Sequence, residues 1–197
     1  MKKVLASVMA VFIVLTSLCV FAETTNLEQI KNIGIMDGIE PSDSVTRAQM
    51  ARIITQTMNI ENADIGCSFD DVSDKTPYYK AIGTVQSLGI MKGCGGNIFA
   101  PDREITYNEV IKTTVTLLGY EPLAQARGGY PNGYIDTAKK LGITEKNLDN
   151  KVVTAEEIAQ ILIKAIDTPL MEQVSFGSDA EYQVTENTIK TKYLGIK

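Results

Sequence analysis

Apolar residues recur at three-residue steps along two segments of the chain, and a third segment ends in the same way. The two stripes are Leu27, Ile30, Ile33 and Ile82, Val85, Leu88. This spacing is typical of the buried face of a helix. A Gly-Ile pair closes each segment, at residues 34–35, 89–90 and 142–143, so the glycines recur 55 and 53 residues apart. Because glycine can adopt the left-handed conformation that ends a helix, we expect three helix ends here.

Three predicted helix starts follow these ends. Thr46, Thr106 and Thr154 each stand three residues before a Gln or Glu. In such a capping box the threonine oxygen accepts from the third amide of the helix, and the longer side chain reaches back to the threonine amide. An apolar residue precedes each threonine and another lies four residues after it, as in a hydrophobic staple. The pattern therefore predicts a helix–loop–helix unit that occurs three times.

A single unit of this kind cannot bury its own apolar stripe. We therefore expect a mainly α fold in which three repeats pack as a pseudo-threefold bundle, over residues 23–62, 63–121 and 122–168. Glycine and proline punctuate residues 121–133, which we interpret as a boundary within this array. The pattern stops near residue 168, and residues 169–197 form a short C-terminal tail. In this tail we expect a strand at 182–184 and a short helix at 188–193.

The first 22 residues predict export. Two lysines precede an apolar run, and Ala22 offers a small residue at a cleavage point, which is the order of a secretory signal peptide. The alternative is an uncleaved membrane anchor. After cleavage we expect a secreted chain with no membrane span. Cys67 and Cys94 would then remain, and they either pair in a disulfide or stay as free thiols.

Composition excludes several classes of function. The 197 residues include no histidine, which removes the commonest general base and zinc ligand. The net charge of −5 argues against bulk binding of nucleic acid, which needs a basic surface. No arrangement of carboxylates or thiols suggests a catalytic site. We therefore expect no enzymatic activity, no cofactor and no metal.

The second unit carries several further motifs in a fixed order. Phe69-Asp-Asp-Val72 leads, Phe99-Ala-Pro101 follows the helix end, and Ile105-Thr106 begins the next helix. This order resembles the repeat of the S-layer homology (SLH) family, and the likeness extends over residues 27–167. The resemblance implies a non-catalytic module that holds extracellular proteins on a bacterial cell wall or S-layer. Its expected ligand is a secondary cell-wall polysaccharide, often pyruvylated, in grooves between repeats.

The same resemblance implies an arginine as a ligand contact. Arg47 keeps the arginine of the family's T-R-A-E segment, whereas Tyr107 and Ala155 stand at the corresponding positions of the other repeats. An arginine at a helix N-terminus also suits a carboxylate ligand. The alternative for Arg47 is a solvated surface residue. Because two of the three arginines are replaced, the rival function is a scaffold that assembles with other envelope proteins through vestigial grooves.

Four further residues are candidate ligand contacts. Asp71 matches the aspartate of the F-x-D-V motif, and Tyr78 and Tyr79 stand where the family has a tryptophan. Gly93 matches the last glycine of the G-I-x-x-G segment. Each has a structural alternative. Asp71 would accept sugar hydroxyls or orient Arg47 in an adjoining groove, and its alternative is to cap the turn around it. At least one of the tyrosines would instead pack on the helix that contains Leu88, and Gly93 would supply a turn with positive φ.

Overall fold

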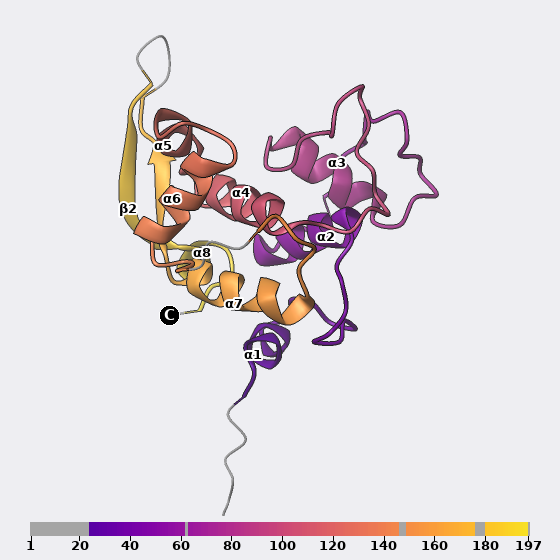
Figure 1. Ribbon diagram of the computed structural model, residues 1–197, viewed down its shortest axis with the longest axis horizontal. Coiled ribbons are helices and arrows are strands. Elements are labelled where there is room, and N and C mark those ends of the chain that lie inside the picture. Colours follow the sequence, from indigo (N-terminus) through magenta and orange to yellow (C-terminus); the bar gives the residue numbers. More distant parts are fainter. Residues whose placement is uncertain (1–23, 62, 146–148, 176–179, 197) are drawn as a thin grey trace, which may run out of the picture.

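The computed structural model describes residues 24–61, 63–145, 149–175 and 180–196. The predicted signal at 1–22 lies outside these ranges. Within them, helices dominate and the mainly α prediction is confirmed (Figure 1). The helices are α1 (Asn26–Asn32), α2 (Arg47–Thr57), α3 (Tyr79–Ser87), α4 (Tyr107–Leu117), α5 (Glu121–Ala126), α6 (Asn132–Lys140), α7 (Ala155–Ile166) and α8 (Ile189–Lys192), and the strands are β1 (Pro169–Gln173) and β2 (Tyr182–Thr188).

The three predicted helix ends are confirmed. Gly34, Gly89 and Gly142 have φ values of +81°, +69° and +71°. After each glycine the isoleucine amide donates back across the last turn, as Ile90 does to the Val85 carbonyl. This is the Schellman arrangement, in which a left-handed residue lets the chain satisfy carbonyls that the helix leaves open.

The predicted helix starts are confirmed as well. Thr46, Thr106 and Thr154 are the N-caps of α2, α4 and α7, and each forms a capping box with the Gln or Glu three residues later. Thr25 caps α1 in the same way, which the sequence analysis did not predict. Each cap satisfies amides that would otherwise lack an intrahelical partner.

The segments that precede the three capped helices also bridge one another. Thr46 pairs with Glu104, Thr106 pairs with Val152, and Ser44 pairs with Thr154, all antiparallel. Each segment therefore contacts the other two, and the N-termini of α2, α4 and α7 are held together. The exact repeat boundaries remain a prediction.

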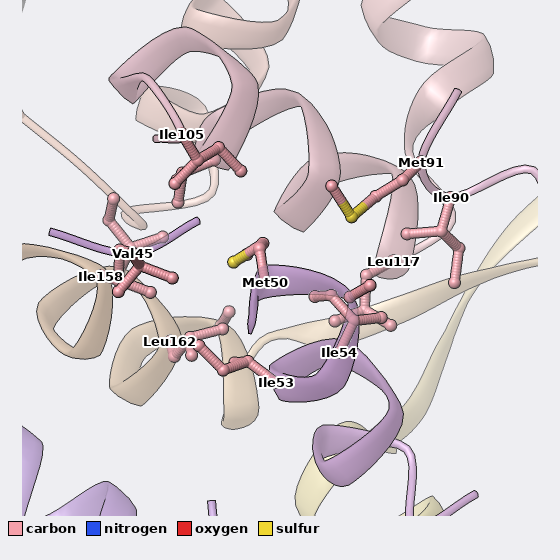
Figure 2. Packing of buried hydrophobic residues seen from close by; sticks show 14 of the residues in the cluster. Val45, Met50, Ile53, Ile54, Ile90, Met91, Ile105, Leu117, Ile158 and Leu162 are labelled. Carbon is pink, nitrogen blue, oxygen red and sulfur yellow. The ribbon is translucent and has the colours of Figure 1, made fainter. Parts of the chain in front are cut away.

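One apolar core lies beneath these helices. Figure 2 shows Met50, Ile53 and Ile54 of α2 among side chains from α4, α7 and the segment after α3. All three α2 residues are at most 1% exposed. Burying an aliphatic side chain of this size contributes about 1.5–3 kcal/mol. Residues more than a hundred positions apart in the sequence therefore pack in the same core.

The expected boundary at residues 121–133 is largely helical, and its role as a boundary between repeats stays a prediction. Pro122 stands in the first turn of α5, where its fixed φ favours a helix start and its missing N–H costs nothing. Gly128 and Gly129 then adopt positive φ and end α5. Helix α6 begins at Asn132, still within the expected boundary. The glycines separate two short helices that pack together.

The tail contains the expected strand at 182–184 as the first part of β2, and α8 lies within the expected helix at 188–193. It also contains β1, which was not predicted, and β1 pairs antiparallel with β2. The hairpin is attached to α4 because the Met171 amide donates to the Leu118 carbonyl over 2.9 Å. Gly119 permits this approach, since a Cβ there would lie 1.9 Å from the Met171 oxygen.

Candidate functional site

A cavity of about 280 Å³ opens beside the start of α2 and one face of α4. Four cationic side chains and one carboxylate line it, together with a tyrosine and the loop after α3. The charged residues are Arg47, Lys92, Arg103, Lys112 and Glu109. We call this space the cationic cavity. Its excess of positive charge suits an anionic ligand in a molecule whose overall charge is negative.

Arg47 forms a buried wall of the cationic cavity. Its Nε donates to the Phe99 carbonyl over 2.8 Å, and its Nη2 donates to the Lys92 carbonyl over 2.8 Å. Its Nη1 contacts Glu109 Oε1 at 3.0 Å, and the guanidinium lies 4.6 Å from the centroid of the Phe99 ring. Arg47 is only 4% exposed. The alternative of a solvated surface arginine is therefore wrong, and this side chain is already well satisfied without a ligand.

Glu109 joins the two arginines of the cavity. Its carboxylate also contacts Arg103 Nη2 at 2.5 Å and accepts from the Thr106 amide within the capping box. Burial works to raise the pKa of Glu109, but the hydrogen bonds from Arg103 and Thr106 and the charge of Arg47 outweigh it. The pKa therefore lies below its ordinary value of 4.5. Glu109 stays ionised at neutral pH and neutralises part of the arginine charge.

Lys112 differs from the other cations of the cavity. Lys92 pairs with Glu121, and both arginines pair with Glu109, whereas none of the ion pairs among the described residues includes Lys112. The Lys112 ammonium instead lies 5.3 Å from the centroid of the Tyr130 ring. Tyr130 is 48% exposed and lines the same cavity. An unpaired cation beside an exposed aromatic ring is therefore available to a ligand.

Sequence reasoning missed both Lys112 and Tyr130. The one usable signal for Lys112 was its position on α4, one helical turn after Glu109, where the two side chains share a face. Tyr130 lay in the segment that we interpreted as a boundary. Its approach to α4 depends on how α5 and α6 pack, which no local pattern shows.

Asp71 is connected to Arg47 through the loop at Phe99. Its carboxylate accepts from the amides of Phe99 and Ala100, over 2.8 Å and 2.7 Å. The Phe99 carbonyl in turn accepts from Arg47. Asp71 therefore supports the loop that holds Arg47, and it does not line the cationic cavity.

The two tyrosines lie elsewhere. Tyr78 and Tyr79 line a separate depression between α2 and α3, where the Arg52 guanidinium lies 5.5 Å from the Tyr78 ring centroid. The Tyr79 hydroxyl accepts from the Cys67 amide, and its ring packs against the core. The structure therefore does not bring these residues together with Arg47.

Gly93 lines the cationic cavity. The structural reason for a glycine at this position differs from the expected one. Its φ is not in the left-handed region, whereas Gly95, Gly96, Asn97 and Ala100 of the same loop have positive φ. A Cβ on Gly93 would lie 2.8 Å from the Ile98 carbonyl oxygen. Close approach of two backbone segments, and not turn geometry, explains the glycine.

Cys67 and Cys94 are free thiols in the structure. Cys67 is half-buried, and Cys94 lies at the cationic cavity, where Arg103 Nη2 is 3.4 Å from its sulfur. Nowhere in the described ranges do three or more cysteine or carboxylate side chains gather as metal ligands would. None of the described helices combines the length and apolar character that crossing a bilayer requires.

A second cavity, of about 170 Å³, lies at the start of α4 in the position that the first occupies at α2. Tyr107 stands there in place of Arg47, and its hydroxyl lies 2.8 Å from the Thr144 hydroxyl. Gln160 replaces Lys112 one turn after the capping-box glutamate. Glu145, Glu157 and Lys164 are the charged residues that line it. This cavity lacks the positive excess of the first.

Comparison with known proteins accounts for this architecture. The family model of the S-layer homology domain matches residues 68–111, which include α3, the loop at the cationic cavity and the start of α4. The chain is an SLH domain protein. The SLH match covers the motifs of the second unit, from Phe69 to Thr106, and the likeness of the first and third units stays a prediction.

Relatives of the SLH chain include bacterial surface proteins. The middle cell wall protein of Brevibacillus brevis is 30% identical over 158 residues, which cover 78% of this chain and 15% of that protein. The surface layer protein of Brevibacillus choshinensis is 29% identical over 220 residues, covering 100% of this chain and 20% of that protein. The exoglucanase XynX of Acetivibrio thermocellus matches only 43% of this chain.

The chain therefore spans a fifth or less of the two surface proteins that it matches. The domain and these relatives indicate an association with the cell wall or surface layer. They also support a role in anchoring at the cell surface.

Proposed function

We propose that this SLH chain attaches to the cell wall by binding an anionic wall polysaccharide, without catalysis, in the cationic cavity. The observation that carries the proposal is Lys112, a cation with no carboxylate partner among the described residues, beside the exposed ring of Tyr130. A pyruvyl ketal or a uronic acid would supply the carboxylate. The pyranose ring beside it would supply an apolar face to stack on the tyrosine.

The residues of the cavity then divide into two groups. Lys112 and Tyr130 contact the ligand, and the exposed ends of Lys92 and Arg103 add positive charge around it. Arg47 is a positioning residue, because its three hydrogen bonds hold the Lys92 and Phe99 carbonyls and the Glu109 carboxylate in place. Gly93 lets its loop approach the Ile98 carbonyl closely.

The charges of the second cavity support the proposal that the chain has one anion-binding site. The second cavity has a glutamine in place of Lys112 and two carboxylates with one lysine, so its net negative charge disfavours binding of an anion. We therefore place the charged residue of the polymer at the cationic cavity alone. Asp71 acts through the Phe99 loop, and Tyr78 and Tyr79 are at most contacts for a neutral sugar farther along the polymer.

Retention on purified cell wall tests the proposal. We expect the wild type to bind intact wall and to lose binding when the polysaccharide is extracted. Lys112→Gln removes the unpaired charge, and we expect about tenfold weaker binding, since hydrogen bonds to charged groups contribute about 1.5–3 kcal/mol. Lys75→Gln, at an exposed lysine of the loop before α3, makes the same charge change outside the cavities and serves as the control.

Two results would refute this function. Equal retention of Lys112→Gln and wild type would remove the cationic cavity as the binding site. Retention that survives extraction of the polysaccharide would instead favour the protein-assembly scaffold. Binding that weakens steeply with added salt would agree with an anionic ligand, because salt screens exposed charge pairs.

A further inference from the structure

The outer strand of the C-terminal hairpin has an open edge. β1 and β2 form a two-stranded sheet, and no other described strand pairs with either. The inner strand, β1, is attached to α4 through the Met171 amide. Figure 1 shows β2 at the left margin of the molecule, on the side of β1 that faces away from α4. One edge of this sheet is therefore held against the body, and the edge formed by β2 is available to another strand.

The register identifies which backbone groups lie on that edge. Just beyond β1, the Val174 amide donates to the Glu181 carbonyl, so residues 174 and 181 face each other through hydrogen bonds. Because such pairs alternate in an antiparallel ladder, Tyr182 and Val184 are in non-hydrogen-bonded positions toward β1. The Met171 amide, opposite Val184, indeed points away from β2. The N–H and C=O groups of Tyr182 and Val184 therefore point outward.

The side chains on this edge are apolar and exposed. Val184 is 51% exposed, and Tyr182 is also exposed, on the same face of the strand. Natural proteins usually protect an open edge with lysine, proline or an inward charge. The segment 182–185, Tyr-Gln-Val-Thr, contains none of these. Its first three residues pair with β1 in regular register. A regular, uncharged edge is typical of a surface that accepts a further strand.

We propose that this edge pairs with β2 of a second copy of the chain, antiparallel, about a twofold axis at Gln183. In this register Tyr182 of each copy lies opposite Val184 of the other. Both residues present outward backbone groups, so each pair exchanges two hydrogen bonds. Each is also an aromatic–β-branched pair, one of the favourable cross-strand combinations.

The charges permit this register. Glu181 lies opposite Thr185 of the second copy, so no like charges face each other within the paired segment. The irregular register of β1 and β2 beyond residue 184 limits the pairing to this short stretch. The net charge of −5 on each copy opposes association at long range. We therefore expect dimerisation to strengthen as salt is added, the opposite of its effect on binding an anionic polymer.

Sedimentation of the purified protein over a range of concentrations tests the pairing. We expect a reversible monomer–dimer equilibrium. Val184→Lys should weaken it by at least about tenfold, because two charged side chains enter the interface at once. Val174→Lys is the matched control: Val174 is 52% exposed in the same hairpin but follows the inner strand, and it should leave the equilibrium unchanged.

A disulfide tests the register itself. In a background with Cys19, Cys67 and Cys94 replaced by serine, Gln183→Cys places two cysteines opposite each other in a non-hydrogen-bonded pair. There the Cα atoms of an antiparallel ladder approach to about 4.5 Å, within disulfide range. Oxidation should yield a covalent dimer. Gln173→Cys, on the inner strand, should not.

The outcomes separate the possibilities. A protein that remains monomeric at all concentrations would overturn the proposal, and so would a dimer that Val184→Lys leaves intact. If the protein dimerises but oxidised Gln183→Cys yields no covalent dimer, the proposed register would be wrong. None of these results depends on wall binding, so they leave the proposed function to its own test.

Discussion

Replacing Arg47 by alanine removes the side chain that connects three parts of the cationic cavity. The guanidinium holds the carbonyls of Lys92 and Phe99 and the carboxylate of Glu109. Its side chain is 5% exposed, so water cannot readily take over these contacts. The substitution therefore leaves two carbonyls without their donor and removes the packing of the guanidinium on the Phe99 ring.

The cost follows from burial. Breaking a buried ion pair by removing one partner costs about 3–5 kcal/mol, because the other charge is left uncompensated. Here Glu109 keeps Arg103 and the Thr106 amide, so we expect the lower end, about 3 kcal/mol. In a chain of this size 1 kcal/mol corresponds to about 2–4 °C in melting temperature. Arg47→Ala should therefore lower the melting temperature by about 6–12 °C.

Arg103→Ala is the matched comparison, because Arg103 contacts the same carboxylate but is 42% exposed. Exposed ion pairs contribute at most about 1 kcal/mol, so we expect a decrease of no more than about 4 °C. Thermal unfolding followed by circular dichroism, with urea unfolding as a check, measures both variants. Equal losses for the two would refute the argument that burial makes Arg47 structural.

Two further predictions concern stability. The pKa of Glu109 is lowered in the folded protein. The ionised carboxylate therefore stabilises the fold at pH values above its unfolded pKa, near 4.5, and this stabilisation is lost as the pH falls through the folded pKa. Glu109→Gln should lose less stability than wild type between pH 6 and pH 3, and parallel pH profiles of melting temperature would contradict this. Gly119→Ala should release the C-terminal hairpin, because the new Cβ would collide with the Met171 oxygen. Limited proteolysis should then cut the hairpin. Gly142→Ala is the control, because Gly142 has positive φ but a Cβ there would have no atom within 4 Å. This variant should lose only about 1 kcal/mol of folding stability, and its hairpin should stay protected.

Local sequence determined three helix starts, at Thr46, Thr106 and Thr154, and three helix ends, at Gly34, Gly89 and Gly142. The capping box at Thr46 lies within four residues and the stop at Gly89 within six, so one short segment contains all the atoms that form each hydrogen bond. Such signals can be read without knowing the fold. The same reasoning did not predict the helices within residues 121–133, because glycine and proline are as typical of helix ends as of linkers.

Only the tertiary structure decided which side chains form the cavity. Arg47 was identified from the sequence, but its acceptors Lys92 and Phe99 lie 45 and 52 residues away, so its burial could not be predicted. Lys112 and Tyr130 meet because α5 and α6 pack back onto α4. The outer position of β2 likewise follows from the attachment of β1 at Leu118. A cap needs only its neighbours in the chain, whereas a binding cavity or an open edge depends on which distant segments the core brings together.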